Sequence, residues 1–142
     1  MNYDLSLDIQ SSSATVWATW MDLSHWAEWA RSFSAIERLD EGPLSKGSHL
    51  RIRQPKLPAS VWEVAELAPE RRLAWQNTRF GVTTFADHRI SLSGTGGVRV
   101  TLSLRQSGPL AGVLGWLTSG LIRRYVQMEA LDLRARCEGK RG

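Results

Sequence analysis

The sequence predicts an α+β fold in which an antiparallel sheet curves around one long C-terminal helix. Three observations support this prediction: one alternating strand begins the chain, several more fill its middle, and a long amphipathic helix ends it. A meander of strands followed by a single long helix usually buries that helix against one sheet face, often around a cavity. The order of patterns therefore favours a container for an apolar or aromatic molecule.

The first third of the chain predicts one strand and two short helices. Apolar and polar residues alternate over 3–9, as in a half-buried strand. A run of three serines can cap a helix over 14–21, and Asp22 or Ser24 can cap a second helix that runs to about Phe33. Four of the seven tryptophans lie in this helical stretch, so we expect it to pack tightly against the sheet.

The middle of the chain predicts a series of strands with connections short enough for hairpins, and hence an antiparallel sheet. Alternation places Gln54 and His88 on the apolar faces of their strands. The strands are expected near residues 35–39, 50–54, 62–64, 73–75, 82–92 and 98–105.

After Pro109 the apolar spacing changes to three and four residues, which predicts a helix from Leu110 to Ala135. Its first half contains three glycines, each costing about 1 kcal/mol relative to alanine in a helix. We expect these glycines, at 112, 115 and 120, to mark a close backbone approach or space kept free. The apolar run over 110–122 is shorter than the ~20 residues of a membrane span, so we expect a packed helix there.

Length and composition fit one domain over residues 1–142, and the order of its strands and helices favours a ligand-binding domain. The N-terminus shows no secretory signal, and the single cysteine, Cys137, fits a reducing cytoplasm. The net charge of +4 clusters only in the tail, at Arg134, Arg136, Lys140 and Arg141. Because no nucleic-acid recognition motif accompanies these charges, we expect no nucleic-acid partner.

Several segments together resemble the START-like, or SRPBCC, superfamily, and in particular its bacterial polyketide cyclase/dehydrase and lipid-transport-like members. The resemblance covers nearly the whole chain and implies a helix-grip fold, with seven antiparallel strands wrapped around the C-terminal helix and a hydrophobic cavity between them. The segments that resemble the family are Val16-Trp17, residues 22–29, residues 47–55, Trp62-Glu63-Val64 and Ala86-Asp87-His88-Arg89.

No motif for a metal or a cofactor is visible. The three histidines, His25, His49 and His88, are isolated, and no phosphate-cradling glycine loop or nucleophile elbow appears. We therefore expect no cofactor, no metal site and no assigned catalytic residue. Of the titratable groups, only His88 is expected to face inward. Burial should lower its pKa and keep it neutral, either as a core residue or as part of the cavity lining.

The candidate ligand-binding residues are large apolar side chains and a few polar ones on the inward faces. For the tryptophans and the tyrosine, lining the cavity and filling the core remain equal alternatives. The candidates are Trp29, Phe33, Gln54, Trp62, Trp75, His88, Leu117, Leu121 and Tyr125.

The sequence favours a carrier or sensor for a small hydrophobic ligand, such as a lipid, an aromatic or a polyketide-like molecule. The alternative is a polyketide cyclase or dehydratase that uses acid-base residues in the same cavity; a regulatory or protein-interaction module is a third possibility. A carrier needs no titratable group in the cavity, whereas acid-base catalysis needs at least one. Either a monomer or a homodimer is compatible with this reading.

Overall fold

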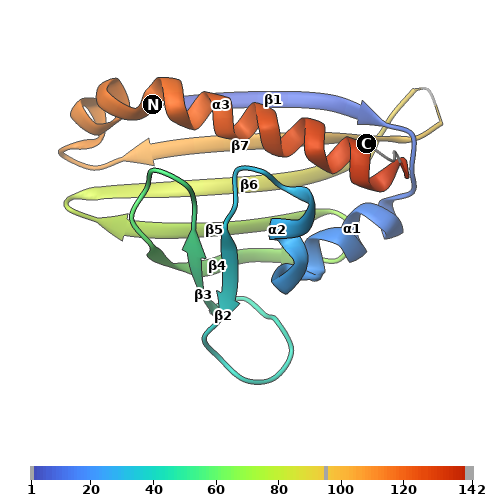
Figure 1. Cartoon of the computed structure of the whole chain (residues 1–142), viewed down its shortest axis with the longest axis horizontal. Helices are drawn as coiled ribbons and strands as arrows, with labels where there is room; N and C mark the ends of the chain where they lie inside the picture. The colour runs from blue at the N-terminus through green and yellow to red at the C-terminus, as the bar shows by residue number, and fades with distance from the viewer. Residues whose placement is uncertain (1, 95, 140–142) are drawn as a thin grey trace.

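The computed structural model describes residues 2–94 and 96–139 and shows the predicted α+β fold (Figure 1). Seven strands form one antiparallel sheet, and a long helix, α3 (Ala111–Cys137), lies across it. The strands are β1 (Asn2–Ile9), β2 (Ala35–Arg38), β3 (His49–Arg53), β4 (Ser60–Ala68), β5 (Arg72–Arg79), β6 (Val82–Leu92) and β7 (Val98–Ser107).

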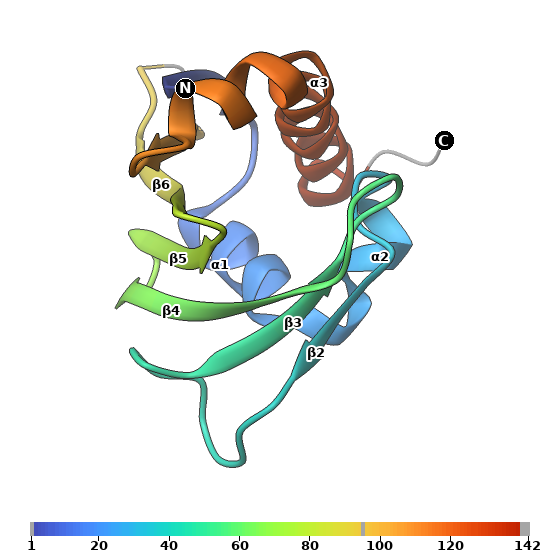
Figure 2. The ribbon, with the colours of Figure 1, turned by 90° about the vertical axis from the view of Figure 1, so that its left-hand side faces the viewer.

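The sheet is a meander with one exception. Strands β2 to β7 follow one another in space, but β1 pairs with β7, so the sheet order is β1-β7-β6-β5-β4-β3-β2. A register shift between Val64 and Glu66 interrupts the pairing of β4 with β5, and such bulges increase local twist. The sheet curves, with α3 on its concave side (Figure 2). The helix-grip arrangement is thus confirmed.

Two short helices, α1 (Ser13–Met21) and α2 (Trp26–Trp29), follow β1, with a single 3-10 turn, Leu23–His25, between them. The Ser12 hydroxyl caps α1 by accepting a hydrogen bond from the Thr15 amide at 3.1 Å. Helix α2 ends four residues before the predicted Phe33. The Arg31 amide instead donates to the Asp132 carboxylate of α3 at 2.9 Å, which turns the chain toward β2.

The core lies where α1, α2 and the second half of α3 meet the sheet. Trp20 and Trp26 are fully buried there, and the Trp26 indole donates to the Trp20 carbonyl at 3.0 Å. From α3, Ala130 and Leu133 are fully buried. This packing closes one end of the concave face, and the β5–β6 and β7–α3 turns lie at the other end (Figure 1).

The basic tail is only partly within the described residues. Arg134 and Arg136 lie in the last turn of α3, where positive charge complements the helix dipole. Lys140 and Arg141 lie outside the described residues. Among the residues that the structure describes, no helix is both long and apolar enough to cross a bilayer.

Candidate ligand-binding cavity

A cavity of about 500 Å³ lies between the concave face of the sheet and α3. This volume is within the range of small-molecule sites, roughly 300–1,000 Å³. Its lining is mainly apolar: Trp62 and Trp75 come from the sheet, and Leu114, Leu117 and Ile122 come from α3. The long helix and the curved sheet therefore enclose a volume suited to an apolar molecule.

The mouth of the cavity is built from two turns in contact. Phe80 and Gly81 form a two-residue hairpin turn between β5 and β6, and both have positive φ, 52° and 75°. Gly108, between β7 and α3, approaches this turn so closely that a Cβ there would lie 2.3 Å from the Gly81 carbonyl oxygen. Any other residue would push the start of α3 away from the hairpin.

The side chains around this mouth are apolar and exposed. Phe80 is 79% exposed despite its strained backbone, and Val113 and Leu117 on α3 are 60% and 67% exposed. All three line the cavity, as does the half-exposed Leu110. Contiguous exposed apolar side chains usually mark an interaction site, and an apolar ligand entering the cavity would contact this cluster directly.

The inner end of the cavity holds a buried ion pair. His88 of β6 donates from Nδ1 to the Leu73 carbonyl at 2.9 Å, and its Nε2 lies 3.1 Å from Oε2 of Glu129 on α3. Both side chains are less than a tenth exposed, and both line the cavity. Three indole rings, Trp20, Trp26 and Trp75, surround the imidazole with ring centroids 5.4, 6.0 and 4.9 Å away.

The prediction that burial lowers the pKa of His88 is wrong. Burial does oppose its charged form, but the Glu129 carboxylate and the Leu73 carbonyl together outweigh burial and raise the pKa of His88 above its ordinary value. The inward orientation of His88 is as predicted. The prediction considered only the neighbours of His88 on the sheet and omitted Glu129, which α3 contributes from the opposite wall of the cavity.

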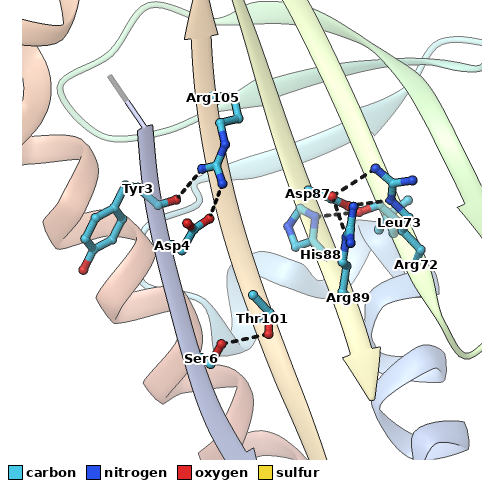
Figure 3. Close-up of polar contacts among 10 residues, drawn as sticks. All are labelled: Tyr3, Asp4, Ser6, Arg72, Leu73, Asp87, His88, Arg89, Thr101 and Arg105. Carbon is cyan, nitrogen blue, oxygen red and sulfur yellow. Dashed lines mark hydrogen bonds and ion pairs between the residues drawn. The ribbon is translucent and has the colours of Figure 1, made fainter.

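Asp87, the neighbour of His88, belongs to a different cluster. Arg72 and Arg89 both donate to its carboxylate, at 2.9 Å each, while the His88 ring points away from this group (Figure 3). Burial works against the Asp87 carboxylate, but the two guanidinium groups hold its pKa below the usual range. Within the described residues, no three His, Cys, Asp or Glu side chains converge as a metal site requires.

Residues 2–138 match the family model described as "Polyketide cyclase / dehydrase and lipid transport". The chain belongs to this family. No curated protein matches the sequence. Among solved structures, the fold is similar to the Zhui aromatase/cyclase from Streptomyces sp. R1128, with 15% identity, a TM-score of 0.77, and 97% of this chain and 93% of that one covered.

Two further structures show the same fold. A START superfamily protein from Mycobacterium smegmatis has 14% identity and a TM-score of 0.73, with 97% of each chain covered. A hypothetical protein from Helicobacter pylori has 18% identity and a TM-score of 0.77, with 96% of this chain and 86% of that one covered. At these identities the similarity concerns the fold alone.

Seven of the nine candidate residues line the cavity of this family member: Phe33, Gln54, Trp62, Trp75, His88, Leu117 and Tyr125. Trp29 does not line it, because its ring packs against Trp26, 4.9 Å between centroids, within the core. Leu121 is half-buried and also does not line it. Successive helical side chains diverge by about 100°, and on this turn Ile122 faces the cavity instead.

Tyr125 lines the cavity with its ring but directs its hydroxyl elsewhere. The hydroxyl donates to the carbonyl of Pro55, in the loop between β3 and β4. This hydrogen bond fixes the loop, which also contributes Gln54, Leu57 and Pro58 to the lining, against the helix. Tyr125 therefore closes one wall and has no hydroxyl proton left for a ligand.

Sequence reasoning missed the polar residues Glu129, Gln106 and Thr84, all of which line the cavity. Glu129 follows Tyr125 by four residues, so both occupy one helix face, and this spacing was the signal available. The structure places Asp132 in an ion pair with Arg31, at 3.0 Å.

Proposed function

We propose that this protein binds a small, mainly apolar ligand in the cavity between the sheet and α3, as a carrier or sensor. The observation that supports this most directly is the cavity itself, about 500 Å³ with a mainly apolar lining and an exposed apolar mouth. The family description, which names both lipid transport and polyketide cyclisation, supports lipids, aromatics and polyketide-like molecules as the ligand class.

The energetics follow from burial of ligand surface. Each Å² of apolar ligand surface removed from water contributes about 25 cal/mol before the costs of association. We further propose that the whole chain acts as one ligand-binding domain, as a monomer or homodimer. A cytoplasmic location would keep the single cysteine, Cys137, reduced.

A filled-cavity variant tests this function. Ala86 lies on β6 between the mouth and His88 and lines the cavity, so Ala86→Phe should occupy ligand volume and weaken binding of Nile red at least about tenfold. The matched control is Leu92→Phe, on the same strand but 91% exposed and outside the cavity, which should bind the dye like the wild type. Equal dye affinity in both variants would contradict ligand binding in this cavity.

A second function is favoured by the His88–Glu129 pair, which places a carboxylate beside the histidine that the sequence predicted to face inward. In a dehydratase acting on a β-hydroxy ketone, Glu129 would take the α-proton and His88 would give its Nε2 proton to the leaving hydroxyl. The C–O bond breaks, water leaves, and proton transfer from Glu129 to His88 restores the pair. The similarity to an aromatase/cyclase is compatible with this chemistry.

The two functions are separated by turnover. An acid-base enzyme should convert an aryl β-hydroxy ketone to the enone, followed by its absorbance, and both Glu129→Gln and His88→Phe should abolish the conversion. A carrier should bind the same compound without converting it. Binding without turnover in the wild type, across several such ketones, would reject the enzymatic function and leave the carrier function standing.

A further inference from the structure

The unsatisfied polar atoms in the cavity lining are oxygens. Among the described residues, two buried side-chain atoms that line the cavity accept no aligned hydrogen bond: Oε2 of Glu129 and Oε1 of Gln106. The Glu129 oxygen has Nε2 of His88 beside it at 3.1 Å, but it has no hydrogen-bond partner of good geometry. Buried acceptors without a donor are costly, so each favours a ligand that supplies one.

Glu129 is the more restrictive of the two. An amide such as Gln106 can rotate to present either its oxygen or its nitrogen, and the nitrogen here lies 3.5 Å from the Thr84 hydroxyl. An ionised carboxylate can only accept, and it offers about four lone-pair sites for hydrogen bonds. Both nitrogens of the His88 ring already have neighbours, because Nδ1 donates to the Leu73 carbonyl at 2.9 Å and Nε2 lies 3.1 Å from the Glu129 carboxylate.

Charge restricts the ligand as well. A ligand carboxylate or phosphate at this end would lie beside Glu129 in a water-poor site, where repulsion between like charges is strong. The cation beside Glu129 at this end, His88, is already paired with it at 3.1 Å. Arg72 and Arg89 are engaged with Asp87 away from the His88 ring (Figure 3). Arg79, which lines the cavity beside Phe80, donates to the Ala59 carbonyl and the Ser60 hydroxyl.

Resting on the function proposed above, we propose that the ligand is an uncharged, otherwise apolar molecule with a hydroxyl group that donates a hydrogen bond to Glu129. Its apolar body lies along β6 and α3 toward the mouth at Phe80 and Leu117. The distance along β6 from His88 to Val82 is about 20 Å at 3.4 Å per residue, which suits a fused-ring phenol or a medium-chain alcohol. Free fatty acids and phosphate-bearing lipids are disfavoured.

Three probes of one size test the inference at pH 7: 2-naphthol has a donor, 2-methoxynaphthalene lacks it, and 2-naphthoate is an anion. Hydrogen bonds to charged groups are worth about 1.5–3 kcal/mol, so the naphthol should bind at least about tenfold more tightly than the methyl ether. The naphthoate should bind most weakly. Quenching of tryptophan fluorescence measures all three, since Trp62 and Trp75 line the cavity.

Variants locate the preference at this ion pair. Glu129→Met alone is not decisive, because a neutral His88 would then present Nε2 as an acceptor. The double variant His88→Phe/Glu129→Met removes both polar groups, and its naphthol-to-ether affinity ratio should fall to about one. Asp132→Asn, which alters the Arg31 ion pair one turn further along α3 and outside the cavity, is the matched control and should keep the wild-type ratio.

The outcomes separate this inference from the proposed function. If none of the three probes binds, the ligand-binding function itself fails. If naphthol and ether bind equally well to the wild type, or the naphthoate binds most tightly, the hydroxyl assignment is overturned while ligand binding stands. If the double variant does not fold, the His88 ring signals in ¹⁵N NMR of the wild type decide: naphthol should shift them and the ether should not, and an equal response overturns the assignment.

Discussion

The two halves of α3 are built in opposite ways. The first half, residues 111–120, is rich in apolar side chains, yet Trp116 and Leu117 are 81% and 67% exposed. The second half, residues 121–137, is more polar, yet it buries Tyr125, Glu129, Ala130 and Leu133. Composition alone would assign the first half to the core and the second half to the surface.

The difference teaches which half the fold needs and which half is left for a ligand. The second half meets β1, α1 and α2, where the indoles of Trp20 and Trp26 complete the core. The first half is attached mainly at its start, where Gly108 contacts the β5–β6 turn, and otherwise lies over the cavity. Apolar residues left exposed beside a cavity are available to contact what enters it.

Two leucine truncations sharpen this comparison most. Leu133→Ala in the second half removes a fully buried side chain and should lower the free energy of unfolding by about 2–5 kcal/mol. Leu117→Ala in the first half, where the side chain is 67% exposed, should change it by less than about 0.5 kcal/mol and instead weaken ligand binding. Urea unfolding of both variants measures the stabilities, and similar losses would show that the two halves do not differ in this way.

The buried ion pair of the second half predicts a pH dependence. Because the pKa of His88 is raised in the folded state, the stability it contributes is fully present below the unfolded-state value of about 6.5. That contribution is lost as pH rises through the folded-state pKa, with a slope of at most about 1.4 kcal/mol per pH unit for one proton. This direction is opposite to that expected for a buried neutral histidine.

Urea unfolding as a function of pH measures this loss of stability, provided that the contribution of a second histidine on the surface is removed. The exposed His25 would contribute a pH dependence of the same sign, because its hydrogen bond with Asp22 at 2.6 Å also raises its pKa. The experiment is therefore done in a His25→Asn background. The fall in stability should persist there and disappear when His88→Phe/Glu129→Met is added; a fall that survives the double change would assign it to other groups.

The fold could be predicted because its information is local. Alternation in β6 and β7 and the three- and four-residue spacing after Pro109 each define an element without knowledge of its partners. The end of α2 could not be predicted, since the Arg31 amide that ends it is bonded to Asp132, about a hundred residues away. Helix boundaries set by distant side chains leave no trace in a local pattern.

The site was predictable on the sheet and much less so on the helix. Period-two alternation allows two faces, so His88 and Gln54 were placed inward correctly. A helix face is a continuous range of directions, so a small error in phase placed Leu121 in the lining instead of Ile122 and left out Glu129. The missed Glu129 then reversed the predicted pKa shift of His88, because a buried charge depends on every wall around it.

The smallest expected effect concerns the glycines of the first half. A close backbone approach was one explanation for them, but a Cβ at Gly112 or Gly120 would meet nothing within 4 Å. Alanine loses less backbone entropy than glycine on folding, so Gly120→Ala should raise the free energy of unfolding by about 0.5–1 kcal/mol. Thermal unfolding followed by circular dichroism measures the change.

The same variant tests whether α3 must flex at these glycines to admit a ligand. If it must, Gly120→Ala should bind Nile red more slowly in stopped-flow mixing. An unchanged rate would show that the open first half needs no such motion. A loss of stability would show instead that this stretch is packed, and it would remove the contrast between the two halves.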